Sequence, residues 1–363
     1  MPELLLPNQT HGMVCAHHHL YSSLARGMPA PPQQPSNFGA ILEQIWWRLD
    51  CALDLDMIYW SAKLGALEAL ESGTTCIIDH HESPNAIEGS LDVIAQACAE
   101  VGVRVSCAYG VTDRHPGDGS IPIENQPNAD TRPTKMTNAA KRGLQENERF
   151  LKAGGRGYVG AHAAFTCADE TLEAVAGLAS DLGVGVHVHV AEGPADADAG
   201  ARWEKLAREN WLLVHCVFLD RELPGIIAHN PRSNFNNSVG YASPARRANN
   251  TVLGTDGIGA DMSEEFRLAY AAHRNDDVTA SPDTAWSWLE NAQKLFSESL
   301  DDVVSWSYSP MEPWHVAFSP GVHATNVWMN GDQVVALGEA TKVDGKEIRA
   351  KANEHKRRLF SFL

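Results

Sequence analysis

The sequence predicts an α/β fold, a (β/α)₈ barrel of the TIM type. Eight short apolar runs recur along the chain, and segments with helical spacing separate most of them. Strand–helix alternation repeated about eight times is typical of a closed parallel barrel. No Gly-x-Gly-x-x-Gly turn follows the first run, which disfavours an open dinucleotide-binding sheet. The length of 363 residues suits one such barrel with a small additional unit.

Each expected strand is a run of apolar or β-branched residues that ends in polar ones. Parallel strands that are buried on both faces have this composition. The eight runs cover residues 12–16, 75–79, 103–109, 158–162, 184–190, 211–216, 226–229 and 251–256.

The segments between the runs predict helices, with two exceptions. Apolar residues step by three and four over residues 60–67, 87–98 and 172–182, and Gly183 stands where a helix C-cap belongs. Residues 217–225 are too few for a full helix, and the Asn-rich segment 234–250 predicts a loop. We therefore expect part of the outer helical ring to be missing.

The last part of the chain differs from the barrel. Residues 303–308 alternate in polarity, and Asn330-Gly331 predicts a hairpin turn. We predict three units: a barrel over residues 12–300, a small β-sandwich-like appendage from residues 1–11 with 301–345, and a C-terminal helix over residues 346–363. Residues 116–136 are rich in Pro and predict a lid or an inserted loop.

The composition argues against several classes of partner. Lys and Arg total 29 against 46 Asp and Glu, so the net charge is −17, which disfavours nucleic acid and anionic membrane surfaces. No stretch of 18 apolar residues predicts a transmembrane helix, and the first residues lack the pattern of a signal peptide. The seven Cys are scattered and odd in number, which favours free thiols in a reducing compartment. We expect a cytoplasmic protein.

Polar side chains at the strand ends indicate a metal site. His17 and His19 are two residues apart, so both point to one side of an extended chain. The fifth run carries His187 and His189, and the remaining ends supply His162, His215, His229 and Asp256. Because barrel enzymes place their active sites at the C-terminal ends of the strands, these groups are expected to converge. Buried imidazoles and a carboxylate without partners would be costly, and a bound Zn²⁺ or Fe²⁺ resolves this.

An ordered set of motifs resembles the amidohydrolase superfamily, in its aminohydrolase and chlorohydrolase branch, and within it the SsnA-like aminohydrolases. The resemblance covers roughly residues 10–275. The matching segments are AHHHLYSSLARG at 16–27, WWRLD at 46–50, SGTTCIIDHH at 72–81, HVHVAE at 187–192, VHCV at 214–217, HNPRSN at 229–234 and LGTDG at 253–257.

The resemblance implies a role for each strand-end group. His17 and His19 match the paired metal ligands of the first strand. His189 matches the fifth-strand ligand because it stands three residues before Glu192, which leaves His187 as the weaker candidate. By the same resemblance, Asp256 is a ligand and proton acceptor, His215 orients the water or substrate or ligates, Glu192 protonates a ring nitrogen, and His162 contacts substrate.

The implied reaction is hydrolytic deamination of a small N-heterocycle such as a purine, pterin or pyrimidine. One divalent transition metal is expected, because no strand end offers the Lys that a dinuclear site requires. Zn²⁺ is preferred over Fe²⁺. A chlorohydrolase or cyclic amide hydrolase on the same scaffold is the alternative, and a catalytically silent metal-binding barrel is the second. We expect either a monomer or a homodimer, since barrel dimers are common.

Three further features are interpreted more conservatively. Arg114, after the third run, is taken as half of a surface ion pair rather than an anion-binding group. Trp46 and Trp47 are expected to pack in the core or a dimer interface. Only sixteen residues precede His17, fewer than is usual in the family, so the appendage is expected to be reduced.

Overall fold

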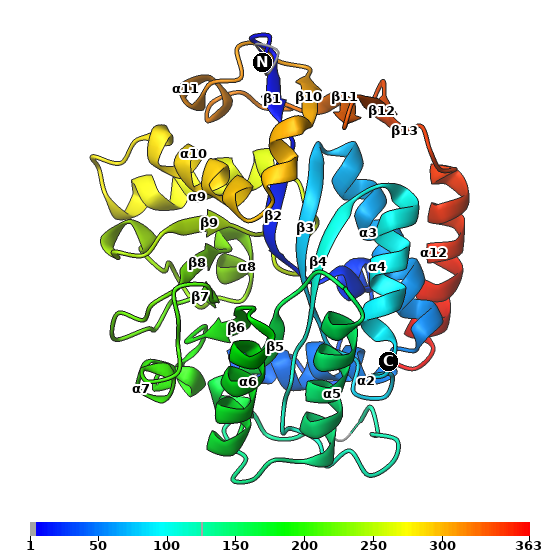
Figure 1. Cartoon of the computed structure of the whole chain (residues 1–363), viewed down its shortest axis with the longest axis vertical. Helices are drawn as coiled ribbons and strands as arrows, with labels where there is room; N and C mark the ends of the chain where they lie inside the picture. Colours follow the sequence, from blue (N-terminus) through cyan, green and yellow to red (C-terminus); the bar gives the residue numbers. More distant parts are fainter. Residues whose placement is uncertain (1–4, 125) are drawn as a thin grey trace.

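The fold is described from a computed structural model that places residues 5–124 and 126–363 (Figure 1). Eight parallel strands form the predicted barrel. They pair as two sheets, β2-β3-β4 and β5-β6-β7-β8-β9. The strands are β2 (Met13–His18), β3 (Thr74–His81), β4 (Arg104–Tyr109), β5 (Val159–Ala163), β6 (Val186–Val190), β7 (Leu212–His215), β8 (Ile226–His229) and β9 (Thr251–Leu253).

Isolated bridges join the two sheets into a ring. Cys107 pairs with Gly157 and Val111 with Ala161, which connects β4 to β5. His18 pairs with Asp256, which connects β2 to the chain just after β9. The prediction of a TIM-type barrel is therefore confirmed.

Helices cover the outside of most of the barrel. In α6, the apolar residues Leu172, Val175 and Ala179 are buried, and Gly183 ends the helix with a left-handed φ of 67°. The helices on the ring are α3 (Leu55–Glu71), α4 (Ser90–Val101), α5 (Asn138–Lys152), α6 (Asp169–Leu182), α7 (Ala199–Trp203), α9 (Met262–Asp276) and α10 (Pro282–Asn291).

The outer ring is reduced where the sequence indicates. Residues 216–225, between β7 and β8, form bends and irregular structure and no helix. The expected loop over residues 234–250 begins later than predicted, because the short helix α8 (Pro231–Asn236) occupies its first residues. Pro231 explains this helix, since its fixed φ suits the first helical position and its missing N–H is not needed there.

A five-stranded antiparallel sheet forms the appendage. Its order is β1-β10-β11-β12-β13, and β1 brings residues near the N-terminus beside the C-terminal part of the chain. Asn330 and Gly331 both have positive φ, 51° and 86°, as the predicted hairpin turn requires. The strands are β1 (Gln9–His11), β10 (Val303–Trp306), β11 (Ala324–Met329), β12 (Asp332–Ala336) and β13 (Glu339–Ala340).

The C-terminal helix α12 (Gly345–Phe360) lies beside α3 (Figure 1). It buries Ile348, Ala352 and Leu359 in the same apolar cluster as α3 and α4. The final carbonyl, of Leu363, accepts a hydrogen bond from Arg48 in α2 (Trp47–Ala52). The boundaries of the three predicted units stay predictions. In the part of the chain that the structure describes, no helix is both long and apolar enough to cross a bilayer.

The barrel interior changes from apolar to polar along the strands. Toward the N-terminal ends of the strands, the interior is filled by apolar residues that include Val14, Ala16, Cys76 and Val214. Closer to the C-terminal ends lie His80 and His187, which are fully buried and have ring centroids 5.0 Å apart. The C-terminal ends of the strands follow, and there the apolar interior gives way to ligand-type side chains.

Candidate metal centre and active-site pocket

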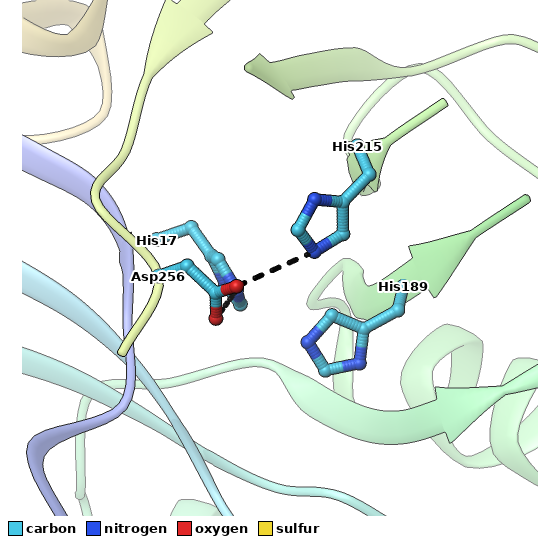
Figure 2. Close-up of side chains that lie close together, drawn as sticks. All are labelled: His17, His189, His215 and Asp256. Carbon is cyan, nitrogen blue, oxygen red and sulfur yellow. Dashed lines mark ion pairs between the residues drawn. The ribbon is translucent and has the colours of Figure 1, made fainter. Parts of the chain in front are cut away.

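Four buried side chains converge at the C-terminal ends of four strands. His17, His189, His215 and Asp256 each offer one ligand atom, and these atoms lie within 4.8 Å of one another. Figure 2 shows the three rings and the carboxylate turned toward a common centre. They belong to β2, β6, β7 and the residues after β9. These elements are distant in sequence, so only the closed barrel brings them together.

His19 joins the same centre. Its Nε2 lies 2.9 Å from Oδ1 of Asp256 and 3.3 Å from Nε2 of His189. Nε2 of His17 lies 3.4 Å from the same Oδ1. All four predicted ligands, together with His215, therefore lie within reach of one site. The ligand role of each residue stays a prediction.

Hydrogen bonds fix three of these rings with Nε2 free to bind. Nδ1 of His19 donates to the carbonyl of His80 (2.6 Å), and Nδ1 of His189 donates to the carbonyl of His162 (2.8 Å). Nδ1 of His215 lies 2.8 Å from Oδ1 of Asn234. A carbonyl can only accept, so the proton is on Nδ1 and the lone pair is on Nε2. Such an arrangement is typical of histidines that ligate metals.

Unpaired nitrogens support a cation at this centre. Nε2 of His17 and Nε2 of His215 are buried and have no hydrogen-bond partner among the described residues. An unpaired buried acceptor is unfavourable by about 1–3 kcal/mol. A divalent cation would satisfy both nitrogens at once, so the residues present fit a metal with nitrogen and oxygen ligands.

Backbone strain helps to place the site residues. His215 and Asp256 have φ of 69° and 55°, a conformation that non-glycine residues rarely adopt. Ala191 and Cys216, beside Glu192 and His215, also have positive φ. Such strain is typical of functional sites. Here it occurs where the chain leaves β6, β7 and β9.

The charge states of the centre follow from burial and from Asp256. Burial alone would raise the pKa of Asp256, but the neighbouring His17 and His19 rings hold that pKa well below its usual value. Burial lowers the pKa of His17 and of His189 well below the usual value, so both rings are neutral and able to ligate. Burial also opposes protonation of His19, but Asp256 raises its pKa to about 9. A cation would displace this proton, because both compete for the same lone pair.

Glu192 lies beside the centre. Its Oε2 is 3.3 Å from Nε2 of His215, and its Oε1 accepts a hydrogen bond from Asn237 (3.1 Å). Burial raises the pKa of Glu192. A carboxyl that keeps its proton toward neutral pH is suited to donate it to a substrate.

A cavity of about 760 Å³, including its open mouth, lies over these groups. His19, His189, Glu192 and Asp256 form part of its lining. Aromatic side chains form much of the remaining wall: Tyr21, Phe38, Trp46, Trp47 and Phe165.

His162, the predicted substrate contact, also lines the cavity. Its Nδ1 lies 2.8 Å from Oγ1 of Thr166, whose hydroxyl can donate to the carbonyl of Ala163. This leaves Nε2 of the His162 ring as the acceptor. Burial, the Arg114 charge and His189 lower its pKa well below the usual value, so the ring is neutral.

Two carboxylates in the cavity wall were not predicted from the sequence. Asp50 and Glu82 both line the cavity, and both pair with Arg114. The interpretation of Arg114 as a surface ion pair is wrong, because only 2% of its side chain is exposed. Its guanidinium lies over Trp47, 4.5 Å from the ring centroid. Trp47 is buried, as expected, but it lines the cavity as well.

Comparisons with known sequences agree with this geometry. The model of the amidohydrolase family matches residues 10–294. A 5'-deoxyadenosine deaminase of Methanopyrus kandleri is 28% identical over 98% of this chain and 86% of its own length. A 5-methylthioadenosine/S-adenosylhomocysteine deaminase of Dictyoglomus thermophilum is 28% identical over 72% of this chain and 62% of its own.

Solved structures share the fold. An adenosine deaminase from Xanthomonas campestris with bound zinc has a TM-score of 0.78 at 20% identity, over 97% of this chain and 86% of its own. Atrazine chlorohydrolase from Arthrobacter aurescens, complexed with zinc, has a TM-score of 0.76 at 21% identity, over 96% of this chain and 88% of its own. At these identities the likeness concerns the fold alone.

Proposed function

The chain belongs to the amidohydrolase family, and on this premise we propose that it is a metal-dependent aminohydrolase that releases ammonia from the 6-amino position of a purine nucleoside. The observation that supports this most directly is the convergence of four imidazole Nε2 atoms and Asp256 beside Glu192 in one cavity. The curated relatives named as deaminases of adenine nucleosides point to the substrate.

The family and the donor set indicate a divalent metal ion, and we propose one Zn²⁺ per chain. The three ligand-type histidines with fixed Nδ1 protons, together with His17 and Asp256, suit zinc, and the same donors suit Fe²⁺. No Lys belongs to the described lining of the cavity, which favours one ion over a pair bridged by a carboxylated Lys. When bound, the metal lowers the pKa of a water molecule so that hydroxide is available near neutral pH.

Side chains of the protein itself transfer the protons of the reaction. The Asp256 carboxylate, with its depressed pKa, is ionised and accepts the proton of the attacking water. Glu192 starts protonated and donates to the ring nitrogen next to the attacked carbon, which neutralises the charge that develops there. The proton held by Asp256 then passes to the leaving amine, and the C–N bond breaks so that ammonia departs. The added hydroxyl group becomes the carbonyl as its proton returns to Glu192, which restores both carboxyl groups. The hydrogen bond between Nδ1 of His215 and Asn234 keeps the His215 ring in place beside Asp256.

The aromatic wall and His162 position the heterocycle. Trp47 and Phe165 belong to one buried apolar cluster at the cavity, which gives a flat ring a rigid surface to pack against. Nε2 of His162 offers an acceptor for a substrate N–H or O–H group. Chloride displacement would use nearly the same residues, so the released product distinguishes the two reactions.

The test is ammonia release from adenosine and 5'-deoxyadenosine by the zinc-loaded protein, followed with the ultraviolet change from a 6-aminopurine to a 6-oxopurine. We expect turnover by the wild type and a loss of about 10²–10⁴-fold in Glu192→Gln, the range of general acid catalysis. Asp198→Asn, in an exposed ion pair with Arg132, is the matched control. No ammonia from any 6-aminopurine would overturn the proposal, and chloride release from a chlorotriazine would favour the chlorohydrolase. A silent barrel would release neither.

A further inference from the structure

One buried carboxylate of the cavity lining takes no part in the proposed reaction. Asp196 closes the short 3₁₀ turn Pro194–Asp196, which follows Glu192 directly after Gly193. It lines the cavity, although only 2% of the residue is exposed. Burial of a carboxylate is unfavourable unless its oxygens are paired, so the partners of Asp196 indicate its role.

Both oxygens of Asp196 accept hydrogen bonds from the backbone of cavity segments. Oδ2 accepts from the N–H of Ala191 (2.7 Å), and Oδ1 accepts from the N–H of Phe165 (2.8 Å). Ala191 follows β6, and Phe165 follows β5. Hydrogen bonds to an ionised group are stronger than those between neutral groups. One side chain thus ties together the ends of two neighbouring strands of the barrel.

The bond to Ala191 bears on the general acid. Ala191 immediately precedes Glu192 and has φ of 48°, a conformation that a residue with a Cβ keeps only when its surroundings hold it there. Its carbonyl accepts a hydrogen bond from the N–H of Phe218 (2.8 Å), so both of its backbone groups are held. The direction in which the Glu192 side chain leaves the backbone therefore depends on the bond that Asp196 accepts.

The bond to Phe165 bears on the aromatic wall of the cavity. Phe165 belongs to the 3₁₀ turn Ala164–Thr166, and its ring forms part of the cavity lining. Arg202 holds the carbonyl side of this turn by donating to the carbonyl of Ala164, whereas Asp196 holds its N–H side. The turn is thus held on both sides, and Asp196 connects it to the strand end that carries the general acid.

We propose that Asp196 is a positioning residue of the active site, which keeps the general acid Glu192 and the aromatic wall at Phe165 at a fixed separation by holding the backbone at both. The inference rests on the proposed function for the role of Glu192. Asp196 acts through its neighbours, because each of its oxygens already binds a backbone N–H group. Misplacement of a reacting group by about 1 Å lowers a rate by about 10²-fold, so the effect is large enough to measure.

Asp113 offers a matched control. Its two oxygens also accept hydrogen bonds from backbone N–H groups, those of Thr137 (2.7 Å) and Ala168 (2.8 Å), and it is likewise buried. Neither of these amides precedes the general acid, and Asp113 does not belong to the described lining of the cavity. Asp113→Ala therefore removes the same number and kind of hydrogen bonds without acting on Ala191.

Hydrogen exchange of the zinc-loaded protein tests the contact without any substrate. A hydrogen bond to a charged group is worth about 10- to 100-fold in an equilibrium constant. In Asp196→Ala we therefore expect the amides of Ala191 and Phe165 to exchange at least about 10-fold faster. Asp196→Asn keeps one acceptor oxygen and should show a smaller increase, whereas Asp113→Ala should leave exchange at Ala191 unchanged. Unchanged exchange at Ala191 in both Asp196 variants would overturn the proposal.

A kinetic cycle with Glu192→Gln separates positioning from a general loss of structure. On a substrate that the wild type deaminates, Asp196→Ala should lower kcat by about 10- to 100-fold. In the Glu192→Gln background the same change should lower kcat by no more than about 2-fold, because the group that Asp196 positions is already lost. Asp113→Ala should change kcat by the same factor in both backgrounds. Metal content is measured in each variant and held equal.

Equal losses of kcat from Asp196→Ala in both backgrounds would overturn the proposal, because a purely structural defect multiplies with Glu192→Gln. Should Asp196→Ala fail to fold, Asp196→Asn carries both measurements, with smaller effects of the same sign. A wild type that releases no ammonia, while exchange at Ala191 still depends on Asp196, would contradict the proposed function but not the hold on Ala191. Turnover with unchanged exchange would do the reverse.

Discussion

Oε2 of Glu192 lies 3.3 Å from Nε2 of His215, at the edge of the centre that Asp256 occupies. Burial raises the pKa of Glu192, while His17 and His19 depress the pKa of Asp256 despite its burial. The pKa values of two neighbouring carboxyl groups are thus shifted in opposite directions. Pairs whose environments separate their pKa values in this way commonly divide the acid and base roles of a reaction.

The pH dependence of kcat/KM follows from this separation. Glu192 must be protonated to donate, so the rate should fall as pH rises through its raised pKa. Asp256 must be ionised to accept, so activity should persist at low pH until its depressed pKa is reached. Glu192→Gln should remove the alkaline decline attributable to this residue along with most of the rate. A pH–rate profile whose alkaline limb is the same in both proteins would assign that limb to another group.

Removing first-strand histidines should remove the metal. We expect about one divalent ion per chain in the wild type and almost none in His17→Ala/His19→Ala, because two of the five converging donors are lost. Elemental analysis after dialysis measures this. His323→Ala, in the exposed part of the appendage, is the control. Two ions per chain in the wild type would instead indicate a dinuclear site.

Asn234 should matter although, among the described residues, its side chain forms a hydrogen bond only with His215. Its Oδ1 lies 2.8 Å from Nδ1 of that ring, and loss of such a partner typically weakens metal affinity or activity by about 10- to 100-fold. We expect this loss in Asn234→Ala, measured by competition for zinc with a chelator and by kcat. Asn234→Asp keeps an acceptor and should retain more activity. Equal defects in both variants would show that only the fold around α8 is affected.

The strand-end chemistry could be predicted from the sequence because it is local. Each of His17, His19, His189, His215 and Asp256 stands at the end of an apolar run, and a barrel gathers such ends by construction. The order of the motifs then identified the family, which the family model confirms. The roles of the individual residues stay predictions.

The cavity wall could not be predicted in this way. Asp50, Glu82 and Arg114 meet only because α2 and the ends of β3 and β4 pack together, and no periodic pattern encodes that contact. Arg114 resembled a surface residue because a Pro-rich loop follows it. In the folded chain, Trp47 covers its guanidinium. The one available signal was that Asp50 and Glu82 lie within or next to the quoted motifs.

The two sheets of the barrel meet at a seam between β4 and β5. This seam gives a stability prediction with an internal control. A Cβ on Gly160, in β5, would lie 2.2 Å from the carbonyl oxygen of Tyr109, a backbone atom that cannot move aside cheaply. Gly160→Ala should therefore destabilise the protein by at least about 1–3 kcal/mol, the usual effect of overpacking. It should also lower activity, because His162 lies two residues further along the strand.

Gly177, within α6, is the matched control for this substitution. A Cβ there meets no atom within 4 Å, so Gly177→Ala should stabilise the helix by about 0.5–1 kcal/mol through propensity alone. Denaturant unfolding of both variants measures the difference, with metal content held equal. Opposite signs are expected because the two glycines differ in what surrounds them. A neutral Gly160→Ala would mean that β4 and β5 are not held at this distance, and that the ring is not closed at this seam.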